Sequence, residues 1–110
     1  KGKISGVHFY NPKKVKIIEI IEKNDITEVF LARFEYFDLK NQKWLKKDKP
    51  STFFPKKWNL SQLLQECKFA YDQIDLSKID NNVIKSITFS KIEVEIVFQN
   101  GKVKTIYPII

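Results

Sequence analysis

Hydrophobic and polar residues alternate with two different periods along the chain, and the longest regular pattern lies between residues 60 and 74. Apolar and small residues recur there at helical intervals: Leu60, Leu63, Leu64, Cys67, Ala70, Tyr71 and Ile74. This spacing predicts one amphipathic helix with a buried stripe. Asn59 and Gln62 have the residue types of a capping box, which places the start of the helix after Asn59.

The last third of the chain follows a strand period instead. Apolar residues at alternate positions from Ile92 to Phe98 enclose Glu93 and Glu95, which is typical of a half-buried strand. Asn100-Gly101 predicts a tight hairpin turn, because both central positions of such a turn need positive φ. Residues 103–107 are the expected return strand, and residues 83–90 are expected to form a strand before the hairpin.

The first half contains two apolar segments that predict consecutive strands. Residues 15–22 and 27–38 are rich in Ile, Val and Phe and are separated by the turn-prone Lys23-Asn24-Asp25. Residues 15–22 could also form one short helix. Two strands, a helix and a three-strand meander indicate an α+β fold, with an antiparallel sheet packed on one face by a helix. Without a linker or repeat, residues 1–110 are expected to form a single domain.

Composition adds a strongly uneven charge. The net charge is +7, and residues 1–58 hold fourteen basic and seven acidic side chains, whereas residues 59–110 hold six of each. Such an asymmetric surface favours a polyanion such as RNA as partner, although a lysine-rich composition is an alternative explanation. Arg33 is the only arginine, so recognition of backbone and shape is expected rather than bidentate reading of bases.

Several classes of site are absent from the sequence. The single Cys67 excludes an internal disulfide and a cysteine-rich zinc site, and neither a glycine-rich phosphate loop nor a GxSxG motif is found. We therefore expect no cofactor and no metal. No run of eighteen apolar residues occurs, so the sequence predicts no transmembrane segment.

Three segments contain side chains suited to chemistry. The only histidine, His8, has the side chain best suited to proton transfer near neutral pH, although a lone imidazole is often packed or exposed without a chemical role. Residues 44–55 hold lysines that could stabilise the negative charge of a phosphorane, beside hydroxyl groups that could donate hydrogen bonds. The candidates are Lys46, Lys47 and Lys49 with Ser51 and Thr52, and the alternative is a solvated loop leading to core aromatics.

The third segment lies at the end of the last strand. Thr105 and Tyr107 share one face of that strand, because side chains alternate, and could hold a phosphate and stack on a base or ribose. An ideal hairpin register would place Thr105 and Tyr107 across from Ile96 and Val94. In that register a partly buried Thr and Tyr in the sheet core is the competing interpretation.

Together these segments resemble the bacterial EndoU family of RNases, which occur as C-terminal toxin domains of contact-dependent inhibition and other polymorphic toxin systems. The matching segments are residues 2–8 (GKISGVH), 51–58 (STFFPKKW, before a helix) and 101–108 (GKVKTIYP). The resemblance implies the fold shared by barnase, EndoU, colicin-type and RelE-type nucleases. It also implies metal-independent transesterification, in which the ribose 2′-hydroxyl attacks phosphorus and leaves a 2′,3′-cyclic phosphate.

The resemblance assigns roles to particular residues. His8 is similar to the second of two family histidines, Lys47 is the first choice for the family lysine with Lys46 next, and Thr105 and Tyr107 match the positioning pair. Ser51, Thr52 and Lys49 are the expected RNA-binding residues. The first family histidine is expected upstream of Lys1, because one imidazole cannot act as both base and acid.

The family also implies a biological setting. We expect a toxin that is secreted or delivered from a cell surface as part of a larger protein, and that acts on tRNA or other RNA in the cytoplasm of a target cell. A cognate immunity protein is the expected protein partner. The alternative is a catalytically silent RNA-binding or protein-interaction module with the same fold.

Overall fold

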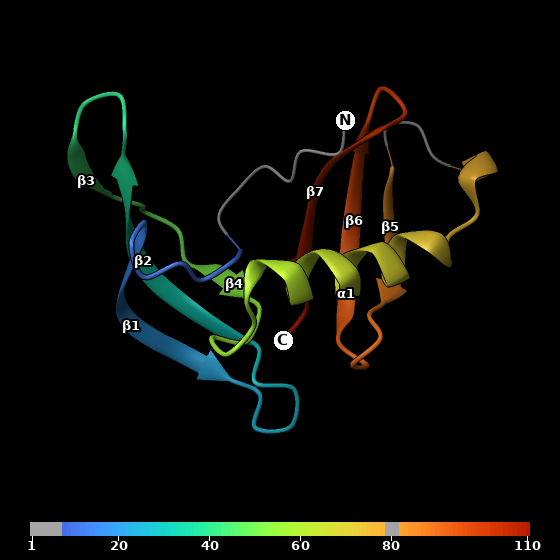
Figure 1. Ribbon diagram of the computed structural model, residues 1–110, viewed down its shortest axis with the longest axis horizontal. Helices are drawn as coiled ribbons and strands as arrows, with labels where there is room; N and C mark the ends of the chain where they lie inside the picture. Colours follow the sequence, from blue (N-terminus) through green and yellow to red (C-terminus); the bar gives the residue numbers. More distant parts are fainter. Residues whose placement is uncertain (1–7, 79–81) are drawn as a thin grey trace.

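The computed structural model describes residues 8–78 and 82–110, which form two antiparallel sheets and one long helix (Figure 1). The fold is therefore α+β, as the sequence predicts. The elements follow one another along the chain as β1 (Val15–Lys23), β2 (Phe30–Asp38), β3 (Lys43–Lys46), β4 (Ser51–Phe53), α1 (Leu60–Asp72), a 3-10 turn (Leu76–Lys78), β5 (Val83–Ile87), β6 (Glu93–Gln99) and β7 (Lys102–Pro108).

The first sheet is built around β2. Its partner on one edge is β1, which settles residues 15–22 as strand and not helix. On the other edge, β3 pairs with the C-terminal part of β2 and β4 with its N-terminal part. The chain therefore leaves this edge between Lys46 and Ser51 and then returns to it. Neither β3 nor β4 is evident in the sequence pattern, where this region looks like a loop.

The second sheet has the order β5-β6-β7. The turn between β6 and β7 has positive φ at Asn100 (54°) and Gly101 (76°), as the Asn-Gly pair predicts. After Phe98 pairs with Val103, the register shifts by one residue, so Val97 pairs with Thr105. Lys104 is the extra residue of a β-bulge. The ideal register predicted from the sequence, with Thr105 across from Ile96, is therefore wrong.

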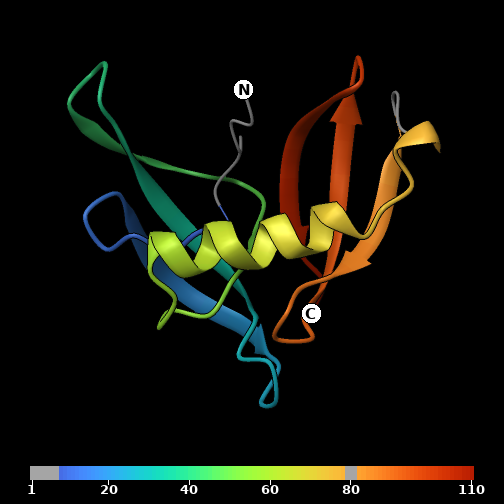
Figure 2. The same cartoon turned by 45° about the vertical axis from the view of Figure 1, so that its right-hand side comes forward.

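Helix α1 lies across one face of the second sheet (Figures 1 and 2). The buried side chains between them belong to the main core, which consists of Val29, Phe54, Trp58, Leu63, Cys67, Ala70, Ile92, Val94, Ile96, Phe98 and Ile106. Asn59 begins the helix, and its side chain accepts a 2.8 Å hydrogen bond from the backbone N–H of Gln62. The Gln62 side chain donates to Glu66 instead of reaching back to complete a capping box. Within the described ranges, no helix is both long and apolar enough to span a membrane.

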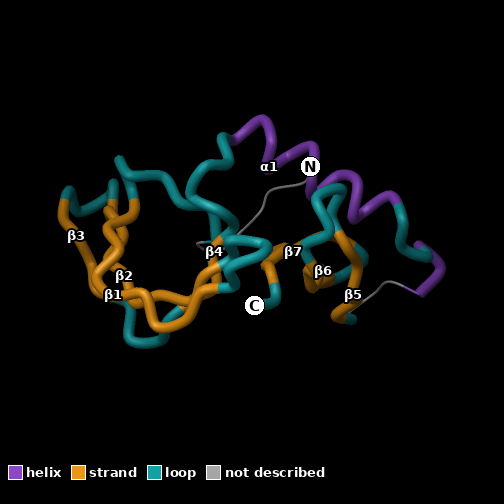
Figure 3. Tube along the Cα trace, turned by 90° about the horizontal axis from the view of Figure 1, so that it is seen from below, coloured by secondary structure: helices purple, strands orange, loops and turns teal. Residues whose placement is uncertain are grey.

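The two sheets have separate cores, and the sheets contact each other where β4 approaches β7. The smaller core lies on the first sheet and contains Val15, Phe30, Ala32, Phe34 and Phe53. Seen from below, α1 lies to one side of both sheets, and β4 approaches β7 between them (Figure 3). The sequence predicts a single sheet, and the division into two is a correction. The short β3 and β4 pair with β2, so they cannot join the later meander.

Candidate active site

His8 lies just before β1 and is attached to the end of β4 by two backbone-directed hydrogen bonds. Its Nδ1 lies 2.8 Å from the carbonyl oxygen of Thr52, and its own carbonyl accepts from the N–H of Phe54 at 2.9 Å. A carbonyl oxygen can only accept, so Nδ1 carries the proton of this bond. In the neutral ring, Nε2 is then left with its lone pair, which is the arrangement a proton acceptor needs.

Electrostatics favour the neutral form of His8. Burial lowers the pKa of His8 below its ordinary value of 6.5, the hydrogen bond to Thr52 raises it, and the positive charge of Lys47 lowers it, with a net lowering. Both lowering effects disfavour the imidazolium cation. The ring of His8 is therefore neutral at neutral pH.

Lys47 lies in the interruption between β3 and β4. Its backbone N–H still bonds to the carbonyl of Phe34, while its Nζ donates to Ser51 Oγ at 3.0 Å and lies 5.6 Å from the centre of the Phe34 ring. Ser51 is only 7% exposed, so its hydroxyl group holds the ammonium group of Lys47 against the first sheet. Lys47 thus carries a fixed positive charge close enough to influence His8.

The neighbouring lysines are placed differently. Lys46 ends β3 and lies across from Glu35, with its side chain alternating away from that of Lys47. Lys49 is exposed within the interruption. Of the three lysines considered from the sequence, Lys47 is the one whose charge acts on His8.

The bulge at Lys104 decides which face of the second sheet carries Thr105 and Tyr107. Ile106 is 5% exposed and belongs to the main core, so Thr105 and Tyr107 alternate onto the opposite face. Tyr107 pairs with Glu95 and Thr105 with Val97. The competing interpretation, that this pair lies in the sheet core, is therefore excluded.

Tyr107 connects the second sheet to His8. The ring centroids of His8 and Tyr107 are 5.5 Å apart with an interplanar angle of 31°. The hydroxyl of Tyr107 donates to the carboxylate of Glu95, and this bond, with burial and the negative charge of Glu95, raises the pKa of Tyr107 to about 12. The phenol of Tyr107 therefore stays protonated at neutral pH, where the imidazole of His8 is neutral.

The geometry brings together groups from both sheets at the point where β4 meets β7. Thr52 and Lys47 come from the first sheet, Tyr107 comes from the second, and His8 lies between them. Within the described part of the chain, no cluster of three His, Cys, Asp or Glu side chains is arranged to hold a metal ion. An imidazole, an ammonium group and a phenol therefore lie in the same region of the molecule.

The sequence profile of the family described as bacterial EndoU nuclease matches residues 1–110, the whole chain. The chain belongs to this family. No curated protein and no solved structure matches the chain well enough to add a closer relative.

Membership of the EndoU family makes the chain an endoribonuclease. Of the first segment that carries the resemblance, residues 2–8, only His8 lies within the described residues. The other two segments supply Ser51 and Thr52 on β4 and Thr105 and Tyr107 on β7. Their catalytic and RNA-binding roles stay predictions, while their positions around His8 are those given above.

Sequence reasoning missed Glu95 as the hydrogen-bond partner of Tyr107. The alternating pattern of β6 places Glu95 on the face away from the core, but Tyr107 reaches that face only because of the bulge. Two residues on neighbouring strands can be paired from sequence only when the register between them is known. The strand pattern therefore predicts the face on which Glu95 lies, but it does not predict that Tyr107 is its partner.

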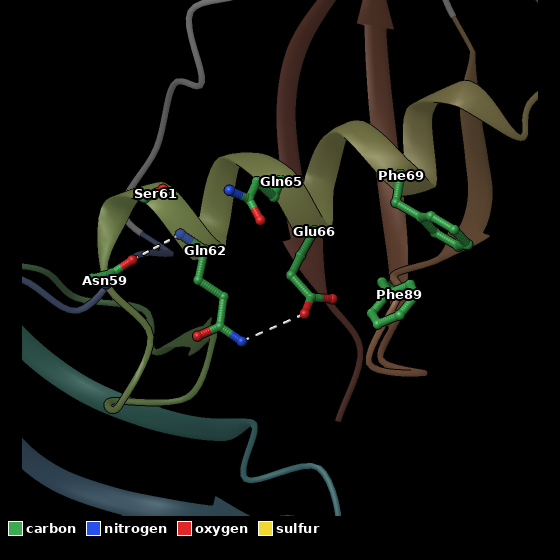
Figure 4. Close-up of a pocket in the computed structure, with 7 residues that line it drawn as sticks. All are labelled: Asn59, Ser61, Gln62, Gln65, Glu66, Phe69 and Phe89. Atoms are coloured by element: carbon green, nitrogen blue, oxygen red, sulfur yellow. Dashed lines mark hydrogen bonds between the residues drawn. The ribbon is translucent and has the colours of Figure 1, made fainter.

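A separate hollow lies along α1, and it contains none of the residues discussed above as catalytic candidates (Figure 4). It has a volume of ≈ 570 Å³ and is lined by Asn59, Ser61, Gln62, Gln65, Glu66, Phe69 and Phe89. Glu66 is 5% exposed and accepts from the backbone and hydroxyl groups of Ser90. This carboxylate therefore has a structural role in joining α1 to the turn after β5.

Proposed function

We propose that this EndoU-family chain cleaves RNA without a metal ion, by attack of a ribose 2′-hydroxyl on the adjacent phosphorus. The products would be a 2′,3′-cyclic phosphate and a free 5′-hydroxyl. The observation that supports this most strongly is the position of the His8 imidazole, which is hydrogen-bonded to the Thr52 carbonyl and lies beside the Tyr107 ring, while the positive charge of Lys47 helps to lower its pKa.

In this mechanism, His8 is the general base. Its Nδ1–H is engaged by Thr52, so Nε2 receives the proton of the attacking 2′-hydroxyl. A lowered pKa keeps Nε2 of His8 unprotonated at neutral pH, although it also makes His8 a weaker base. Fixing the ring by a backbone carbonyl reduces the loss of orientational freedom on reaching the transition state.

Lys47 and Tyr107 act on either side of the reacting phosphate. The ammonium group of Lys47, held by Ser51, stabilises the charge that develops on the non-bridging oxygens. Tyr107 and Thr105 position the nucleotide from β7, where the bulge turns both toward the open face. Lys46, Lys49 and Thr52 extend the RNA contact surface around this centre.

The leaving 5′ oxygen needs a proton donor, and a base that has just accepted a proton is on the wrong side of the phosphorus to supply it. The 110 residues contain one histidine. We propose that a second imidazole, from sequence preceding Lys1, acts as this acid. The isolated 110 residues would then cleave RNA poorly or not at all.

The biological role follows from the same family resemblance. We propose that the nuclease is a toxin domain, secreted or displayed as part of a larger protein, that degrades tRNA or another RNA in the cytoplasm of a target cell. A cognate immunity protein would protect the producing cell. An acidic partner is favoured, because lysines outnumber carboxylates in the first half of the chain.

The experiment compares residues 1–110 with a chain extended upstream, each incubated with total RNA and with purified tRNA in a metal chelator. We expect the extended chain to leave cyclic-phosphate ends, detected by mass spectrometry, and His8→Asn to abolish cleavage at an unchanged melting temperature. Intact RNA at stoichiometric amounts of the extended chain would reject the proposal.

The single histidine supports a second candidate, an RNA-binding module that has lost catalysis. Such a module would bind RNA with an affinity that falls steeply with salt, because binding to phosphates releases counterions. Salt-dependent binding by the extended chain without any cleavage would favour this candidate over the nuclease mechanism.

A further inference from the structure

Glu95 is a carboxylate on the face of the second sheet that carries Tyr107. It lies on the central strand β6, across from Lys85 on β5 and from Tyr107 on β7. Its neighbours Val94 and Ile96 are fully buried in the main core, so Glu95 projects from the opposite face. Residues directly opposite one another in antiparallel strands project from the same face, so the three side chains form a row across the sheet.

A negative charge at this position needs a physical reason. A carboxylate beside a phosphate-binding site repels the substrate, and this face borders the site around His8. Lys85 supplies an opposite charge on the adjacent strand, which reduces the repulsion. The direct contact of Glu95 is with the hydroxyl group of Tyr107.

The direction of this hydrogen bond limits what Tyr107 can do. An ionised carboxylate only accepts hydrogen bonds, and a phenol has one hydrogen to donate. With that hydrogen directed to Glu95, the phenol oxygen has only lone pairs left for another partner. Tyr107 then offers a nucleotide a hydrogen-bond acceptor on its oxygen and the surface of its ring.

We propose that Glu95 is a positioning residue of this nuclease, which fixes the Tyr107 phenol and makes its oxygen an acceptor for an O–H or N–H group of the bound nucleoside. The inference rests on the proposed function and adds the chemical polarity of the contact. In this arrangement Tyr107 does not donate to a phosphate oxygen. The phosphate charge is left to Lys47.

The state of the phenol supports this assignment. Because the pKa of Tyr107 is raised to about 12, its hydrogen stays in place throughout the neutral and mildly alkaline range. The two residues are also held by the pairing of β6 and β7, so the contact does not depend on a mobile loop. The polarity of Tyr107 is therefore built in before a substrate binds.

The test is a double-mutant cycle in the upstream-extended chain, with a dinucleotide as substrate. Glu95→Gln should lower kcat/KM by about tenfold in the wild-type background and cause no further loss in Tyr107→Phe, because Glu95 acts through Tyr107. Glu93→Gln, on the same strand and face, is the matched control and should leave kcat/KM unchanged. Equal losses in both backgrounds, or no loss in the first, would overturn the proposal.

A second measurement does not depend on cleavage. The ultraviolet absorbance of phenolate in the 110-residue chain, minus that of Tyr107→Phe, isolates Tyr107 from the other three tyrosines. Glu95→Gln should move this titration from about 12 toward the ordinary value of 10.0, since the negative partner is removed. An unmoved titration would overturn the Glu95 contact, whereas a moved titration without any wild-type cleavage would instead reject the proposed function.

Discussion

Tyr107 lies directly across from Glu95 in the β6–β7 hairpin, because one extra residue in β7 shifts the register after the tight turn. If Lys104 were paired and not bulged, strict alternation from Val103 would put Thr105 and Tyr107 on the core face and Ile106 on the opposite face. With Lys104 bulged out of the pairing, Tyr107 lies on the face that adjoins His8. The bulge thus determines which of two neighbouring side chains, Ile106 or Tyr107, lies beside His8.

Ile106 and Tyr107 should therefore respond oppositely to substitution. Ile106→Ala should lower the free energy of unfolding by about 2–5 kcal/mol, because Ile106 is buried in the main core. Tyr107→Phe should lower it by only about 1 kcal/mol while reducing cleavage. Chemical denaturation and initial rates on RNA measure the two effects, and a reversed pattern would mean that the register is not the one described.

The influence of Lys47 on His8 can be measured directly by NMR, since the chain has one histidine and hence one imidazole titration. Lys47→Gln removes a positive charge that disfavours the imidazolium form, so it should raise the pKa of His8. Lys46→Gln is the matched control, with the same charge change at the adjacent residue. Equal shifts in the two variants would contradict the placement of Lys47.

The pH dependence of cleavage should reflect the pKa of His8, and the positive charge of Lys47 should therefore influence it. Because the pKa of His8 is lowered below 6.5, kcat/KM should persist as the pH falls from neutral and decline only as the pH passes through that lowered value. In Lys47→Gln the acidic limb should move to higher pH, and the plateau rate should fall by about 10²-fold.

Lys46 and Lys49 provide the comparison for that rate. Lys46→Gln and Lys49→Gln should weaken RNA binding and reduce its dependence on salt concentration. They should leave the acidic limb of the pH profile in place. Rates are measured against pH at two salt concentrations. If Lys49→Gln lowered the plateau rate as much as Lys47→Gln does, the assignment of Lys47 as the residue that stabilises the phosphate charge would be wrong.

Glu66 should make the fold sensitive to acid. Burial raises the pKa of Glu66, but hydrogen bonds from Ser90, Gln62 and Thr88 together lower it by more than burial raises it, so the pKa lies below its ordinary value of 4.5. A lowered folded-state pKa gives stability that is present above 4.5 and is lost as the pH falls through the folded value. Glu66→Gln should flatten this loss in melting temperature, and a slope unchanged from wild type would contradict it.

Local features of the fold could be predicted from the sequence because they depend on residues close together in the chain. The apolar spacing from Leu63 to Ala70 predicts the buried stripe of α1, and Asn59 marks its start. Asn100 and Gly101 predict the turn between β6 and β7. In each case a few adjacent residues determine the backbone conformation, so distant contacts are not needed.

The division into two sheets and the register of β7 could not be predicted in this way. Strands β3 and β4 have four and three residues, too few for an alternating pattern, and their pairing with β2 depends on tertiary contacts. The bulge at Lys104 has no distinctive residue type. Among the adjacent lysines, only the interruption of the sheet edge separates Lys47 from Lys46.

The orientation of His8 depends on a peptide carbonyl and not on a neighbouring side chain. Every residue type carries that carbonyl, so the side chain at Thr52 can be exchanged without turning the imidazole, as long as β4 keeps its pairing with β2. Substitutions at Thr52 should therefore leave the hydrogen bond of His8 in place. Sequence changes can therefore alter the side chain at the proposed RNA-binding residue Thr52 while the orientation of the His8 ring is kept.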